Sequence, residues 1–137
     1  MKELEKLLKQ HEGYRTKPYK CSAGKISIGI GFNLDDVGLY PEEIDFILRN
    51  RIKRKTKLAR AIFPWFNDLS KTRQVVILDM LYNIGPGSLL GFRKMITAIE
   101  EGDFARAADE MLKSKWSEQV GNRAKRLARF MRENKIT

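Results

Sequence analysis

The sequence contains one cysteine and one histidine, Cys21 and His11, among its 137 residues. A single cysteine excludes an internal disulfide, and a single histidine excludes a zinc site built from several histidines, so we expect neither a metal nor another cofactor. No apolar run approaches the roughly 18 residues that a transmembrane helix needs. Residues 1–9 alternate charge with leucine and contain no unbroken apolar stretch, which predicts that no secretory signal is present.

Acidic residues are few relative to basic ones. The chain has 17 Asp and Glu against 27 Lys and Arg, which gives a formal net charge of +10. This excess indicates a polyanionic partner without identifying it. With 42% hydrophobic and 32% charged residues, the composition is typical of a soluble globular chain of one domain, residues 1–137.

The first 40 residues predict a helix followed by a small sheet. Leu4, Leu7 and Leu8 have the spacing of one buried helical face, on a helix over residues 1–12 that ends near Gly13. After a turn at residues 22–25, isoleucine alternates with serine or glycine over 26–31, which predicts a hairpin or sheet. Glycines within such a strand indicate a surface at which another molecule approaches the backbone closely.

The remainder of the chain predicts helices. Pro41 is a good first-turn residue for a long helix over about 41–60 that joins two lobes, 13–40 and 61–137. A dense run of Lys and Arg covers the outer face of this helix, and a solvated face is favoured there over a dedicated anion site. Ser70 and Asn122 are predicted N-caps of later helices, and residues 85–87 (Gly-Pro-Gly) should end the buried helix that starts at Ser70.

Glu12 is the first candidate catalytic residue, because it lies where the N-terminal helix meets the glycine-rich strand segment. A carboxyl group at such a junction can be partly desolvated and so remain protonated, as a general acid requires. The alternative is a surface glutamate on an amphipathic helix, and position alone favours that alternative.

Four separated blocks of the sequence change this balance. The first is residues 11–31, with a Glu-Gly pair, a Tyr-Lys pair and an Ile-Gly-x-Gly strand. The others are residues 79–85, the pair at 91–92, and residues 113–116 with 122–126. In this order they resemble the phage-type lysozymes, the T4 lysozyme-like muramidases or endolysins of glycoside hydrolase family 24. The resemblance covers most of the chain.

The resemblance implies an α+β fold with a small β-containing N-terminal lobe, a helical C-terminal lobe and a polysaccharide cleft between them. It implies inverting hydrolysis of the β-1,4 bond between N-acetylmuramic acid and N-acetylglucosamine in peptidoglycan. The matching catalytic positions are Glu12 as general acid, Cys21 where the family usually has Asp, and Ser27 where it usually has Thr. Asn33 and Tyr82 fall where the family contacts the substrate.

An inverting glycosidase needs one group to protonate the leaving oxygen and another to activate water on the opposite face of the sugar. An ordinary free thiol is mostly uncharged at pH 7, so Cys21 would act as a base only with the help of cations such as Lys20 and Lys25. Ser27 offers a hydroxyl group that can hold the water. We interpret the cysteine as marking an active subtype of the family.

Two alternatives remain open for this position. Cys21 could be a turn residue of an inactive wall-binding relative, or a carboxylate of Asp35 or Asp36 could replace it in the reaction. Elsewhere, Trp116 is expected in the helical core, and His11 is interpreted as a helix-end residue.

The expected partner is bacterial peptidoglycan, with the positive charge drawing the protein to anionic wall or outer-membrane polymers. We expect a monomer held in the host cytoplasm until a holin opens the membrane, the holin being an export route rather than a bound partner. No recognition motif predicts specific nucleic-acid binding. The alternative is a basic membrane-active or wall-binding protein with an amphipathic segment at 123–135, although core packing of its apolar face is favoured.

Overall fold

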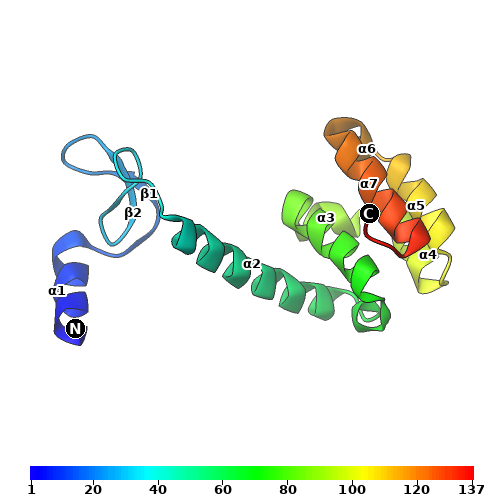
Figure 1. Ribbon diagram of the computed structural model, residues 1–137, viewed down its shortest axis with the longest axis horizontal. Helices are drawn as coiled ribbons and strands as arrows, with labels where there is room; N and C mark the ends of the chain where they lie inside the picture. Colours follow the sequence, from blue (N-terminus) through cyan, green and yellow to red (C-terminus); the bar gives the residue numbers. More distant parts are fainter. The chain divides into compact units, whose positions relative to one another are not determined.

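The computed structural model describes residues 1–137 and divides into an N-terminal unit, Met1–Leu48, and a C-terminal unit, Arg49–Thr137. The elements of the N-terminal unit are α1 (Lys2–Glu12), β1 (Arg15–Lys20), β2 (Ile26–Gly29), β3 (Phe32–Asn33) and the start of α2 (Pro41–Ile62) (Figure 1). The C-terminal unit continues with η1 (Phe66–Asp68), α3 (Lys71–Leu90), α4 (Arg93–Glu100), α5 (Phe104–Leu112), α6 (Lys115–Val120) and α7 (Asn122–Glu133). The predicted α+β class is confirmed, whereas the lobe boundaries stay a prediction.

The N-terminal unit contains a three-stranded antiparallel sheet in the order β1-β2-β3. Its central strand ends at Gly29, earlier than the predicted 26–31, because Gly29 and Gly31 adopt positive φ angles of 70° and 65° and turn the chain into β3. Burial within β2 falls on Ser27, which is 3% exposed, whereas Ile26 remains 41% exposed. The sheet therefore turns its serine, and not its first isoleucine, away from solvent.

Helix α1 ends as predicted, because Gly13 takes a φ of 83° and its N–H donates to the carbonyl of Lys9. No residue of α1 is buried, so the expected burial of its leucine face is not observed. Helix α2 begins at Pro41, where the backbone N–H of Tyr40 donates to the carboxylate of Glu43 at 2.7 Å. This contact satisfies one of the free donors at the helix start and fixes its first residue.

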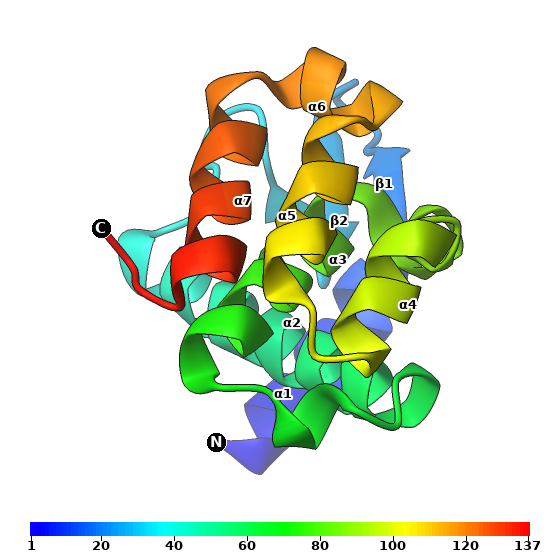
Figure 2. The same ribbon diagram turned by 90° about the vertical axis from the view of Figure 1, so that its right-hand side faces the viewer.

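The core of the C-terminal unit surrounds α3. Figure 2 shows α5 and α7 side by side, and both contribute buried side chains to the same apolar cluster as α3. Ser70 caps α3 by accepting from the N–H of Arg73 at 3.2 Å, as predicted. The helix is interrupted at Gly85, where φ is 79°, as the Gly-Pro-Gly segment predicts. The cap of α7 is Gly121 and not Asn122, because the chain needs a φ of 58° at that point, which favours glycine.

Arg73 joins the start of α3 to the end of α7. Its guanidinium lies 3.7 Å from the ring centroid of Phe104, and its Nε donates to the carbonyl of Met131 at 2.8 Å. Burial lowers the pKa of the Arg73 guanidinium below its ordinary value. The group still carries its charge at neutral pH, so it satisfies a carbonyl of the last turn of α7 that no helical N–H can reach.

The apolar face of α7 is packed inside the C-terminal unit, where Leu127, Phe130 and Met131 are all buried. Core packing therefore accounts for the amphipathic pattern at 123–135. No single helix combines the length and apolar character needed to cross a bilayer; α3 and α4 satisfy that test only when joined, across a bend of 100°. The buried side chains of α3 belong to the core described above.

Candidate active site

The carboxyl group of Glu12 lies directly against the backbone of Gly31. Glu12 is the last residue of α1, and Gly31 lies in the turn between β2 and β3. A Cβ atom built on Gly31 would lie 2.5 Å from Oε2 and 2.9 Å from Cδ of Glu12, closer than real Cβ contacts come. The space beside Gly31 is thus occupied by the chain's own carboxyl group, and the approach of another molecule to these glycines stays a prediction. Glu12 itself is exposed, so the partial desolvation expected at this junction is not observed.

Ser27 lies at the centre of the sheet, opposite Tyr19 of β1 and opposite Asn33 of β3. Directly opposed residues of antiparallel strands place their side chains on the same face. Ser27 is the one polar residue of the chain that is buried. Tyr19 and Asn33, which lie opposite it, are half-buried. The predicted site residues Ser27 and Asn33 are thus brought together by strand register.

Cys21 begins the turn that follows β1. Its N–H donates to the carbonyl of Lys25 at 2.9 Å, and its own carbonyl accepts from Gly24 at 2.9 Å. Strand alternation continued one residue past β1 puts Cys21 on the face that carries Tyr19 and Ser27. By this register and alternation Cys21, Ser27 and Asn33 share one face of the sheet. The thiol of Cys21 is free and half-buried.

The two aspartates after β3 have structural partners. Asp36 lies 3.2 Å from the ammonium of Lys25 and accepts from the side-chain amide of Asn33 at 3.1 Å. Asp35 accepts from the N–H of Ile26 at 2.8 Å. Lys25 therefore has a carboxylate partner, which weakens its expected role as a cation for Cys21. The same contacts give both aspartates a structural explanation as loop anchors.

Tyr82 lies on α3 in the C-terminal unit and is 49% exposed, so it is not a core aromatic residue. It lines a pocket of about 460 Å³ together with Arg51, Arg54, Lys55 and Leu58 of α2. The sequence indicated the basic run on this helix but favoured a solvated face for it. That three of its cations line one pocket was not predicted, although their spacing on one helix face is a signal for it.

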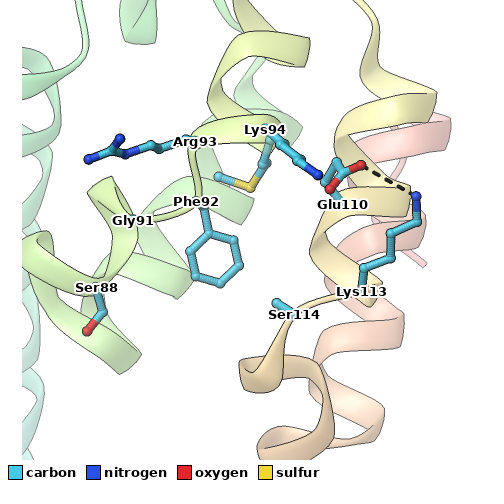
Figure 3. A pocket seen from close by; sticks show the side chains of 9 residues that line it. Ser88, Gly91, Phe92, Arg93, Lys94, Glu110, Lys113 and Ser114 are labelled. Carbon is cyan, nitrogen blue, oxygen red and sulfur yellow. Dashed lines mark hydrogen bonds and ion pairs between the residues drawn. The ribbon is translucent and has the colours of Figure 1, made fainter.

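Trp116 is buried, as predicted, and its indole N–H donates to the side-chain carbonyl of Asn83 at 2.8 Å. Its ring meets the edge of Phe92 at a centroid distance of 6.0 Å. Phe92 also lines a second pocket, of about 470 Å³, in the C-terminal unit (Figure 3). None of the residues predicted for catalysis lines this second pocket, whose rim includes the ion pair of Lys113 and Glu110.

Comparison with known proteins gives one consistent result. A family model described as phage lysozyme matches residues 9–134. The chain is 25% identical to "Probable T4-type lysozyme 1" of Dictyostelium discoideum over 154 aligned positions, covering 90% of each chain. It is 28% identical over 120 positions to the "Endolysin" of Acyrthosiphon pisum secondary endosymbiont phage 1, covering 85% of this chain and 78% of that protein.

Proposed function

Because this chain belongs to the phage lysozyme family, we propose that it is a glycoside hydrolase acting on bacterial peptidoglycan. The bond cleaved is the β-1,4 bond between N-acetylmuramic acid and N-acetylglucosamine, and the chain is assigned to glycoside hydrolase family 24 as a cysteine-containing variant. The observation that carries the proposal is the contact between the Glu12 carboxyl group and Gly31. That contact places a potential proton donor beside the turn that joins β2 to β3, the strands that carry Ser27 and Asn33.

In the proposed mechanism Glu12 gives its proton to the glycosidic oxygen as the bond to the leaving sugar breaks. Water attacks the opposite face of the ring, so the configuration at that carbon is inverted. The proton that this water loses passes to the Cys21 thiolate if Cys21 is the base, and to solvent if Cys21 only positions the water. Cys21 and Ser27 position or activate this water, and their place on one sheet face supports a shared role. The hydroxyl of Ser27 can both donate to the water and accept from it.

Asn33 and Tyr82 are proposed to contact the substrate. The side chain of Asn33 is held by Asp36, which accepts from its amide and donates a backbone N–H to its carbonyl at 2.9 Å. An amide fixed in this way presents a defined orientation to a sugar. Tyr82 offers an exposed ring and hydroxyl, a combination that suits the apolar face and polar rim of a saccharide.

The test is the clearing of purified peptidoglycan by the wild type and by Glu12→Gln. The substitution keeps the size of the side chain and removes its acidic proton, so we expect the rate to fall by about 10² to 10⁴-fold. Circular dichroism of both proteins checks that the fold is unchanged. Equal clearing by the two proteins would eliminate Glu12 as the acid.

We also propose that the protein is a monomer that remains in the host cytoplasm and reaches the wall when a holin opens the membrane. Sedimentation analysis measures the molecular mass in solution, and the mass of a dimer would contradict the proposed monomer. Fractionation of cells before and after holin expression tests the location. Enzyme found on the wall side without holin would contradict the release route.

A further inference from the structure

Helix α2 carries a group of unpaired cations. Between Asp45 and Asp68 the sequence contains no acidic residue. The positive residues of this stretch are Arg49, Arg51, Lys53, Arg54, Lys55, Lys57 and Arg60. None of them forms an ion pair, and the one polar side-chain contact among them joins Arg60 to the amide oxygen of Asn67 at 3.0 Å.

Three of these cations line one pocket. Arg51, Arg54, Lys55 and Leu58 follow the i, i+3, i+4, i+7 spacing of a single helix face, and they line the pocket of about 460 Å³ that Tyr82 of α3 completes. The three charges repel one another on the helix, and no carboxylate lines the pocket to offset them. An anion bound among them would remove that repulsion and gain charge-assisted hydrogen bonds.

The geometry points to a phosphate group carried on a saccharide, and we propose that this pocket binds phosphorylated sugar units of an anionic polymer of the bacterial envelope. Two guanidinium groups and one ammonium group suit a phosphate, because Arg offers paired donors and Lys a compact charge. The pocket volume exceeds what a phosphate fills, and Leu58 and Tyr82 supply an apolar and aromatic wall for the attached ring. The pocket has one aromatic residue and no series of rings on which successive bases would stack, which disfavours single-stranded nucleic acid.

The choice of envelope polymer rests on the proposed function, which brings the protein to the wall, but binding at the pocket does not require catalysis. The measurements therefore use the Glu12→Gln protein throughout. If binding fails while the wild type hydrolyses peptidoglycan, only the pocket proposal fails. If hydrolysis fails while binding holds, only the proposed function fails.

The matched comparison uses two triple variants of α2 in that background. One replaces the pocket cations, Arg51→Gln, Arg54→Gln and Lys55→Gln. The other, Arg49→Gln, Lys53→Gln and Lys57→Gln, removes the same charge from residues of the same helix that do not line the pocket. Thermal unfolding followed by circular dichroism confirms that both variants fold.

The probes are N-acetylglucosamine 1-phosphate, inorganic phosphate and unphosphorylated N-acetylglucosamine, titrated by NMR. We expect the sugar phosphate to bind most tightly and the pocket variant to lose about tenfold or more in affinity, while the control variant stays within about threefold. Replacing Tyr82→Ser should weaken binding of the sugar phosphate but not of inorganic phosphate. Equal losses in the two triple variants would show a diffuse charge effect and overturn the proposal.

The polymer is tested by cosedimentation with cell walls before and after hydrofluoric acid, which removes phosphodiester-linked polymers. Treatment should lower the bound fraction of the parent protein to that of the pocket variant. Unchanged binding after treatment would overturn the assignment to a phosphopolymer. Pocket-dependent binding of a DNA oligonucleotide that exceeds binding of the wall polymer would reassign the pocket to nucleic acid.

Discussion

Replacing Gly31→Ala perturbs the contact on which the proposed acid depends. Gly31 has a φ of 65°, in the left-handed region where a side chain other than hydrogen costs about 1–2 kcal/mol. The new methyl group would also lie 2.5 Å from Oε2 of Glu12, whereas ordinary van der Waals contact starts at 3.4 Å. The carboxyl group must therefore move by about 1 Å, a shift that can lower the rate by about 10²-fold.

The control for backbone strain is Gly102→Ala. Gly102 has a similar φ of 74°, and no atom lies within 4 Å of the position that its Cβ would take. Both variants should therefore lose about 1–2 kcal/mol of unfolding free energy in urea titrations. Only Gly31→Ala should also lose activity, because only there does the methyl group displace the glutamate.

Activity is measured as the initial rate at which a suspension of purified peptidoglycan clears. A further comparison adds Gly31→Ala to the Glu12→Gln protein, where we expect no additional loss of rate, because both changes act on the same proton transfer. A Gly31→Ala protein that clears peptidoglycan at the wild-type rate would refute the reasoning. Equal loss of rate in the Gly102→Ala protein would also refute it, since strain alone would then explain the effect.

Three further predictions concern other residues. Cys21→Ala should lower the clearing rate by about tenfold or more. Cys21→Asp should retain activity at neutral pH, because a carboxylate is ionised there. Full activity of Cys21→Ala at every pH tested would rule out a thiol base. Arg73→Met should lower the free energy of unfolding by about 2 kcal/mol, because it leaves the carbonyls of Met131 and Arg132 without their side-chain donor. A urea unfolding curve with the same midpoint and slope as that of the wild type would contradict this prediction. Trp116→Phe should cost about 1–2 kcal/mol by leaving the Asn83 carbonyl without its indole donor, and wild-type stability would argue against that contact.

Local chemistry made several elements predictable from the sequence. Pro41 starts a helix, Ser70 caps one and Gly85 interrupts one, because each effect depends on the residue itself and on its near neighbours. The cap at Gly121 was missed because a side-chain cap at Asn122 and a glycine cap one residue earlier give similar sequence patterns. The α+β class followed from the sum of these local signals.

Contacts between distant residues were harder to predict. Strand alternation showed that Ser27 and Ile26 point to opposite faces but not which face is buried, since that depends on what packs against the sheet. The approach of Glu12 to Gly31 and the pairing of Lys25 with Asp36 depend on how turns fold back, which no local pattern encodes. The resemblance to lysozymes named Glu12, and the structure adds the glycine whose missing side chain leaves room for its carboxyl group.

The most direct test of the proposed reaction is mass analysis of the fragments released from purified peptidoglycan by the wild type and by Glu12→Gln. Hydrolysis with Glu12 as the acid predicts fragments that end in reducing muramic acid from the wild type and almost none from the variant. Fragments that end in anhydro-muramic acid would show transglycosylation instead. No fragments from the wild type, or the same fragments from both proteins, would contradict the proposed role of Glu12.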